Sequence, residues 1–517
     1  MTSSTHRKIR QASLLLMGSI ILSRIVGFFR EWALAQTVGA TALTDVYYAS
    51  FTIPDFLNHL MAAGALSISF IPMLSGYLES GNEVFGKRVF QALSTAMGCV
   101  LIVFILVCEL WAAELANLIA PGFDPSQKTL LVQLLRLILP AQFFFYWGGL
   151  AISVQQTYGR FFLPAVAPIV YNFFIIVFGV LLHRNLGVMG FSIGILVGSF
   201  LGHGLLQWVG LRKLGYPILP SFVFPKEIRL AIKRYFWLTF PIMISFSVVV
   251  TDEWVSKYFA SFMERRALSW LSYARTEMRI PIAIIGQAAG IASFPFLARL
   301  WEQKDYEGYG KTLLTEIEKL WAAGTVAALI LIVHALPITQ FIYGGGRFTH
   351  EDLLRTTEAV QIFGIGVFFW TVQVVLARGF YACGRTWLPS IIGTVISLLG
   401  LPFYYVFGKM MGYQGLAWAG TASIVLFSGA LWLLLLRHLK RHVPNLDYRD
   451  FNRFCTAWIA VIAVIWLVAK LILAAPIYRH TRISALLDIL VVSLATLGIC
   501  LPLLRTYFRR FTGEPLF

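Results

Sequence analysis

The sequence predicts an all-α polytopic membrane protein of about fourteen transmembrane helices, in two pseudo-symmetric six-helix lobes plus two C-terminal helices. Three observations predict this class. The 517 residues are 58% hydrophobic and only 13% charged, a balance that would make a soluble protein aggregate. Apolar runs long enough to cross a bilayer recur along the whole chain. Finally, the two halves of the chain repeat each other, which is typical of transporters.

The apolar runs give the expected helices in chain order. The connections on the outer side are short throughout, so the sequence leaves no room for a soluble domain that could carry out chemistry. The expected spans lie at about 10–37, 42–78, 88–115, 127–157, 162–182, 187–210, 232–261, 267–299, 315–341, 352–383, 387–408, 413–437, 452–474 and 484–506.

The internal repeat has an offset of 225 residues. The segment 159–164 (GRFFLP) returns as 384–389 (GRTWLP), and 186–190 (LGVMG) returns as 411–415 (MGYQG). A looser echo links Pro72 to Pro295, each followed by a Glu and a Gly-Lys pair. The offset covers six helices, so the two lobes should have the same orientation in the membrane. We therefore expect an N-terminal lobe at 1–215, a second lobe at 216–440, and two extra helices at 441–517.

The net charge of +17 follows the topology. With the N-terminus inside, about 25 Lys and Arg fall in cytoplasmic segments and about eight on the other side, which is the positive-inside bias. The charge thus predicts a membrane protein with both termini in the cytoplasm and needs no nucleic-acid partner. The five cysteines lie in apolar spans without paired spacing, which indicates neither a disulfide framework nor a metal site.

Charged residues inside the spans are the candidate functional groups, because each costs about 2.5–3.5 kcal/mol on insertion. They gather in the opening helix pair of each lobe, and by pseudo-symmetry we expect them to line one cationic cavity. Arginine offers a planar fork that matches phosphate oxygens, so a phosphate- or pyrophosphate-bearing substrate fits better than an amine or a neutral sugar. The groups are Arg24, Arg30, Glu31, Asp45, Asp55, His59, Asp252, Glu253, Lys257, Arg275, Glu277 and Arg279.

Some of these groups have alternative interpretations. Arg30 and Glu31 could form a local ion pair that snorkels to the interface. Asp252 could bind a cation or pair with a basic residue. Arg275 and Arg279 lie four residues apart on one helix face, with Glu277 on another, and at least one of the two arginines should be functional.

The chain resembles the MurJ (MviN) family of lipid II flippases, within the MATE-like (MOP) superfamily of exporters. The resemblance rests on segments spread over the chain, at 23–31, 44–45, 63–72, 259–261, 269–281, 343–348 and 377–389. It implies a V-shaped bundle with a central cationic cavity, a lateral portal, and a lipid-tail groove formed by the last two helices. It also implies headgroup contacts from Arg24 and Arg30, supported by Glu31 and Asp45.

The chain departs from the family pattern at several charged positions. Thr52 and Asn58 stand where the second helix usually carries Lys and Arg. In the eighth helix the usual acid-Arg pair reads Arg275-Thr276, and in the seventh the frequent Asp aligns with Ser256. The cavity is therefore rebuilt, which leaves the choice of headgroup sugar open.

These observations predict a flippase that moves a polyprenyl-pyrophosphate-linked saccharide, lipid II for peptidoglycan synthesis and cell shape, by alternating access. It is a transporter and not an enzyme, with no cofactor and with coupling to Na+, H+ or the membrane potential. Its partners would be lipid II, the bilayer and cell-wall synthesis proteins. The alternatives are a flippase for O-antigen or exopolysaccharide units, a MATE-type antiporter, and a membrane glycosyltransferase. The predicted substrate-binding residues are Arg24, Arg30, Glu31, Asp45, Asn58, Arg275 and Arg279, with Asp252 as a candidate cation ligand.

Overall fold

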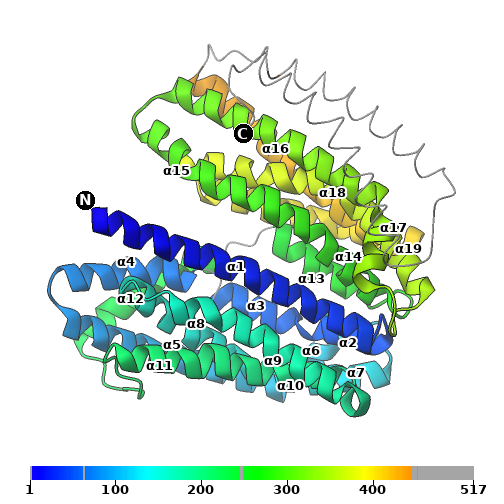
Figure 1. Cartoon of the computed structure of the whole chain (residues 1–517), viewed down its shortest axis with the longest axis horizontal. Coiled ribbons are helices and arrows are strands. Elements are labelled where there is room, and N and C mark those ends of the chain that lie inside the picture. Colours follow the sequence, from blue (N-terminus) through cyan, green and yellow to red (C-terminus); the bar gives the residue numbers. More distant parts are fainter. Residues whose placement is uncertain (1–2, 62–64, 245–247, 444–450, 452–517) are drawn as a thin grey trace. The chain divides into compact units, whose positions relative to one another are not determined.

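The computed structural model describes residues 3–61, 65–244, 248–443 and 451, and its helices pack into two units, Met1–Ser245 and Phe246–Phe517. Figure 1 labels the helices along the chain. Those of unit 1 are α1 (Ser3–Thr37), α2 (Ala42–Ser50), α3 (Thr52–Met61), α4 (Ala65–Glu79), α5 (Glu83–Leu110), α6 (Ala112–Ile119), α7 (Pro125–Ile138), α8 (Ala141–Thr157), α9 (Phe162–Leu186), α10 (Val188–Ser199), the π-helix η1 (Phe200–Leu205), α11 (Leu206–Lys213) and α12 (Lys226–Ile244).

Unit 2 begins after α12. Its elements are α13 (Val248–Ala260), α14 (Ala267–Pro281), the π-helix η2 (Ile282–Gln287), α15 (Ala288–Glu302), α16 (Tyr306–Val333), α17 (Ala335–Tyr343), α18 (His350–Ala382) and α19 (Trp387–His442).

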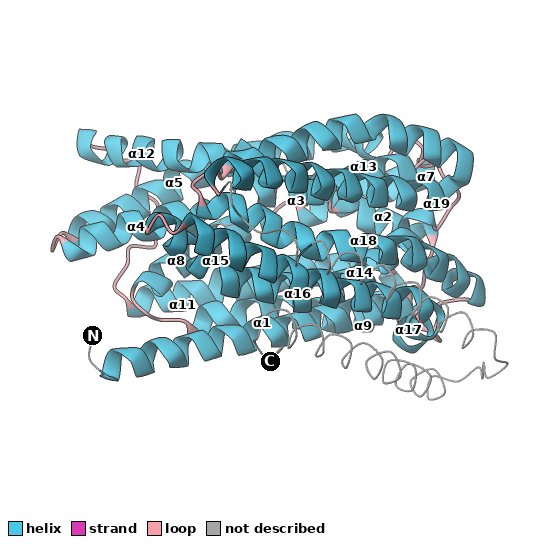
Figure 2. Cartoon of the chain, turned by 90° about the horizontal axis from the view of Figure 1, so that it is seen from above, coloured by secondary structure: helices cyan, strands magenta, loops and turns pink. Residues whose placement is uncertain are grey.

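The fold is all-α, as the sequence predicts. The described residues contain no β-strand, only an isolated bridge between Gly345 and Phe348, and Figure 2 accordingly shows helices joined by short loops. Six described helices are long and apolar enough to cross a membrane. The pair α16 and α17, bent by 73° at its break, adds a seventh. The count of fourteen stays a prediction, and spans 452–474 and 484–506 lie outside the described residues.

One predicted span contains a described break. In the run 42–78, α2 ends at Ser50 and α3 begins at Thr52, with Phe51 in a turn between them. A sliding apolar window averages over many residues and does not register a break of one residue. α12 packs against α3, α4 and α5, so it belongs to unit 1 although the repeat assigns it to the second lobe. The lobe boundaries drawn from the repeat stay a prediction.

The repeat predicted from the sequence recurs in the backbone. α5 and α16 both have 28 residues and begin 223 positions apart, at Glu83 and Tyr306, and each is followed by a short helix after one residue. Gly187 and Gly412, 225 positions apart, break their helices with nearly the same dihedral angles, φ 53° and ψ −128° against φ 61° and ψ −139°. Gly159 and Gly384 also match, with φ of 69° and 72°. These positive values favour glycine.

Close packing of α9 places a polar side chain beside α1. α9 lies against α10 so tightly that a Cβ built on Gly194 would come within 2.6 Å of Ile175 Cα, and one on Gly198 within 2.6 Å of the Tyr171 carbonyl oxygen. Small residues permit such backbone approach in membrane helices. α9 also packs on α1, which brings Asn172 toward the charged segment of α1.

Candidate functional site

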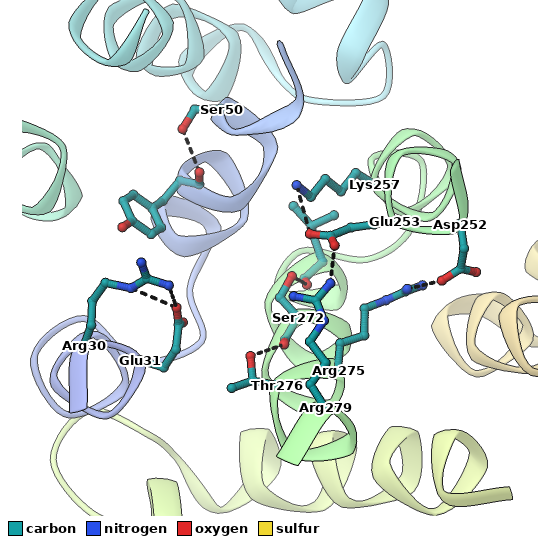
Figure 3. A network of polar contacts seen from close by, with 12 residues as sticks. Arg30, Glu31, Ser50, Asp252, Glu253, Lys257, Ser272, Arg275, Thr276 and Arg279 are labelled. Atoms are coloured by element: carbon teal, nitrogen blue, oxygen red, sulfur yellow. Dashed lines mark hydrogen bonds and ion pairs between the residues drawn. The ribbon is translucent and has the colours of Figure 1, made fainter. Parts of the chain in front are cut away.

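In unit 1 the charged cluster is built on Arg30 and Glu31 of α1. The Arg30 guanidinium donates to Glu31 Oε1 through Nη2 at 2.6 Å and through Nε at 3.2 Å, and its Nη1 donates to Asn172 Oδ1 at 3.2 Å. Glu31 Oε2 accepts from the Tyr48 hydroxyl of α2 at 2.7 Å. Figure 3 shows Arg30 and Glu31 side by side on their helix. The cluster thus ties α1 to α2 and α9.

The Arg30 side chain is only partly withdrawn from solvent. It is 27% exposed, whereas the Glu31 side chain is 9% exposed. Three of the five guanidinium N–H groups are used in the three bonds above. Arg30 is therefore held in place by neighbours and still presents donor capacity to an anion, which is the arrangement that fork-like phosphate recognition needs.

The other predicted residues of unit 1 lie on the same or adjacent helices. Arg24 is exposed on α1, six residues before Arg30. Asp45 is buried in the first turn of α2, and Asn58 is half-buried on α3. The structure brings Arg30 and Glu31 into direct contact, and it shows Asp45 as an interior group of α2.

In unit 2 a buried ion pair joins α14 to α13. Arg275 Nη1 donates to Asp252 Oδ2, and the Tyr404 hydroxyl of α19 donates to Asp252 Oδ1. The Arg275 and Asp252 side chains are 8% and 6% exposed. The guanidinium also lies over the Phe363 ring of α18, 4.9 Å from its centroid. Both oxygens of Asp252 are thus engaged by protein donors, and Arg275 stands where an external cation would otherwise be needed.

A second pair on α14 is more accessible. Arg279 donates to Glu253, and Glu253 also pairs with Lys257 Nζ at 3.3 Å, four residues along α13. The Arg279 side chain is 56% exposed. Figure 3 shows Arg275 reaching Asp252 and Arg279 reaching Glu253 from the same helix. One turn of α14 therefore separates an interior arginine from a solvent-facing one.

Thr276 takes no part in these pairs. Its hydroxyl donates to the Ser272 carbonyl oxygen one turn earlier at 3.0 Å, as the Ser272 hydroxyl does to Leu268 at 2.7 Å. Such bonds satisfy hydroxyls within their own helix. At position 276, where the resemblance implies an arginine, the chain therefore has a hydroxyl that is bonded within its own helix.

Three partner residues escaped the sequence reasoning. Asn172, Tyr48 and Tyr404 each contact a predicted charged group, but each comes from a different helix. Asn172 left one signal, since it is a lone amide in the apolar run 162–182. The tyrosines left none, because Tyr is common near membrane interfaces. Within the part of the chain that the structure describes, no group of three His, Cys, Asp or Glu side chains is arranged to hold a metal ion.

Comparison with known proteins gives a consistent result. The family model of the lipid II flippase MurJ matches residues 34–484. The chain is 29% identical to the lipid II flippase MurJ of Burkholderia cenocepacia over 429 residues, which cover 81% of this chain and 83% of that protein. It is 25% identical to the probable lipid II flippase MurJ of Vibrio cholerae over 442 residues, covering 83% of each.

Solved structures with the same fold include two transporter types. A lipid II flippase MurJ in an inward closed conformation matches with a TM-score of 0.77 at 21% identity, covering 97% of this chain and all of that one. An inward-facing multidrug resistance MATE family transporter of the MOP superfamily matches with a TM-score of 0.68 at 10% identity, covering 84% of this chain and all of that one. At these identities the likeness concerns the fold.

Proposed function

The chain belongs to the lipid II flippase MurJ family, and we propose on that premise that it moves lipid II across the membrane for peptidoglycan synthesis. It is a transporter and not an enzyme. The observation that carries the proposal in this chain is Arg30, a half-exposed arginine that an acid and an amide hold in place within apolar helices. A pyrophosphate is a ligand that such a fork binds bidentately.

The individual roles of the site residues are part of the proposal. Arg24 and Arg30 of unit 1 and Arg279 of unit 2 would contact the anionic headgroup, because all three side chains reach solvent. Glu31 and Asp45 would hold the helices of unit 1 in position beside the arginines. Asn58 would contact the sugar. Arg275 was expected to contact the headgroup directly. Its burial beside Asp252 supports a positioning role for the helix that carries Arg279.

A flippase for another lipid-linked glycan is the second candidate. It is favoured by Asn58 and Thr276, which stand where the family usually carries basic residues. Both candidates share the pyrophosphate chemistry and differ in the sugar. We also propose coupling to an ion or to the membrane potential, and contacts with cell-wall synthesis proteins.

For the location we propose the bacterial inner membrane with both termini in the cytoplasm. Single cysteines in a Cys-free background test this topology. Arg184→Cys and Arg347→Cys should react with an impermeant maleimide added to intact cells. Lys87→Cys and Lys226→Cys should react only after the membrane is opened. The reverse pattern would overturn the orientation that the basic residues indicate.

Complementation tests the function itself. Expression of the chain in a bacterium depleted of its own lipid II flippase should restore growth and cell shape. Reconstitution then separates the two candidates, because purified protein in liposomes should move fluorescent lipid II faster than an undecaprenyl pyrophosphate carrying an O-antigen unit. Equal or faster movement of the second substrate would favour the other glycan.

A further inference from the structure

A buried acid on α14 takes no part in the two arginine pairs. The Glu277 residue is 1% exposed. Its Oε2 accepts from the Thr339 hydroxyl of α17 at 3.1 Å, while its Oε1 is buried without a hydrogen-bond partner. Arg275 and Arg279, two residues to either side, are directed to α13 instead. Glu277 is thus a carboxyl with one neutral donor and no cation.

Side chains on the face of α14 that carries Glu277 contact α17. Tyr273, one turn before Glu277, places its ring centroid 4.7 Å from that of Tyr343 and 5.4 Å from that of Phe348. α17 follows α16 after the 73° bend, so it is a short segment that α14 contacts through aromatic rings and one carboxyl–hydroxyl bond. Glu277 also lies about 16 Å along α14 from Arg266, at 1.5 Å per residue.

The charged and titratable groups around α14 are engaged elsewhere. Asp252 binds Arg275 and Tyr404, Glu253 binds Arg279 and Lys257, and Asp352 of α18 accepts from Trp270 and Arg266. Among the described residues none forms an ion pair with Glu277. Other buried or half-buried titratable groups on helices packed against α14 include Glu318 of α16, Tyr343 of α17, Glu358 of α18 and Tyr413 of α19, the last two bound to each other.

The burial of the Glu277 carboxyl without a cation determines its protonation state. An ionised carboxylate without a cation or a full set of donors is strongly disfavoured away from water, and such a group takes up a proton instead. The neutral acid is the less costly form here, because the carboxyl receives one hydrogen bond from a neutral hydroxyl and its second oxygen receives none. The packed arrangement of α14 on α17 therefore requires a proton on Glu277.

We propose that Glu277 is a proton-binding site of the transport cycle. It holds a proton while α14 packs on α17, and it releases that proton to water when the two segments part. The ionised form then opposes repacking until a proton returns, so the state of Glu277 is linked to the position of the helix that carries Arg279. This inference rests on the proposed flippase function for its cycle, but the proton site itself can be measured without transport.

Infrared difference spectroscopy of the purified full-length protein tests the proton site directly. At pH 7 the native protein should show a carbonyl-stretch band of a protonated carboxylic acid that Glu277→Gln lacks. Glu318→Gln, which changes another buried glutamate of the same unit, should retain that band. A spectrum of Glu277→Gln that keeps every protonated-carboxyl band of the native protein would overturn the inference.

Liposomes with an imposed pH difference test the link to transport. Movement of fluorescent lipid II by the native protein should change with the direction of the gradient, by up to about tenfold per pH unit for one proton. Glu277→Gln should be slower and insensitive to the gradient, whereas Glu318→Gln should respond as the native protein does. An equal gradient response in Glu277→Gln would overturn the inference. If the native protein moves no lipid II at all, the proposed function fails, and the infrared bands still decide whether Glu277 holds a proton.

Discussion

The arginine pairs of the two units differ in how far water reaches them. Arg30 of unit 1 is 27% exposed and pairs with the acid next to it on the same helix. Arg275 of unit 2 is 8% exposed and pairs with Asp252 on another helix, under a tyrosine hydroxyl and over a phenylalanine ring. The same residue type thus lies in two different environments. The partly exposed arginine has donors that a ligand can reach, whereas the buried one joins two helices.

The largest expected effect concerns the buried pair. Asp252→Ala leaves the Arg275 charge unpaired in the interior, which should cost about 3–5 kcal/mol of stability. Thermal unfolding of the detergent-solubilised protein would measure it. The double change Asp252→Ala with Arg275→Leu should recover most of the loss, because it removes both charges. If Asp252→Ala is as stable as the native protein, Arg275 is not an interior anchor and the contrast between the units disappears.

The next effect concerns the half-exposed arginine. Arg30→Ala should lower lipid II transport at limiting substrate by tenfold to more than a hundredfold, since a charge-assisted hydrogen bond contributes about 1.5–3 kcal/mol. The protein should still accumulate in the membrane. Arg30→Lys should retain part of the activity, because a point charge replaces the fork. Arg136→Ala, at an exposed arginine 4.0 Å from Glu109, serves as the control and should transport normally.

Normal transport by Arg30→Ala would contradict the role that the comparison gives to the partly exposed arginine. It would mean that the exposed donors of Arg30 serve the Glu31 pair alone and that the headgroup binds elsewhere.

A smaller effect tests how alike the two units are in their turns. Gly159 and Gly384 have nearly equal positive φ values, and a Cβ at either would meet nothing within 4 Å. Alanine at either position should therefore lower the free energy of unfolding by the same amount, about 1–2 kcal/mol, because both would hold it in a left-handed backbone conformation. Thermal unfolding of the two single variants measures it. A difference much larger than 1 kcal/mol between the two variants would show that the two turns contribute unequally to stability.

The smallest expected change in stability is that of Arg279→Ala. The side chain is 56% exposed, and exposed ion pairs contribute about 0.2–1 kcal/mol. Transport should nevertheless fall, because Arg279 is the solvent-facing arginine of α14. Arg275→Ala should show the opposite balance, with lost stability as the primary defect. A stable Arg275→Ala variant that cannot transport would restore the direct headgroup contact expected from the sequence.

The sequence was sufficient for the fold class and the repeat. Apolar runs and recurring segments are local signals, and the recurring glycines at 159 and 384 carry the turn geometry with them. Charges in apolar runs also pointed to Arg30, Glu31, Asp252 and Arg275. The partners could not be predicted, because a pair such as Asp252 and Tyr404 is 152 residues apart and depends on packing between helices.

A break within a predicted span was missed although the sequence marks it. Where α2 ends at Ser50 and α3 begins at Thr52, Pro54 and Asp55 follow in the first turn of α3, as at many helix starts. The surroundings of Glu277 could not be predicted from the sequence either. Its neighbours in sequence are charged, which suggested a shared cluster, but the helix turns it toward α17 and away from Arg275 and Arg279. Direction around a helix decided its chemistry.

Under the role proposed for Arg30, its contact with Glu31 has a kinetic consequence. An anionic headgroup that binds Arg30 must compete with a carboxylate already 2.6 Å from the guanidinium, so part of the attraction is cancelled in advance. The same carboxylate is ready to take the arginine back when the cargo leaves. A carrier benefits from such a standing competitor, because it shortens the residence time of each cargo molecule and keeps release from limiting turnover.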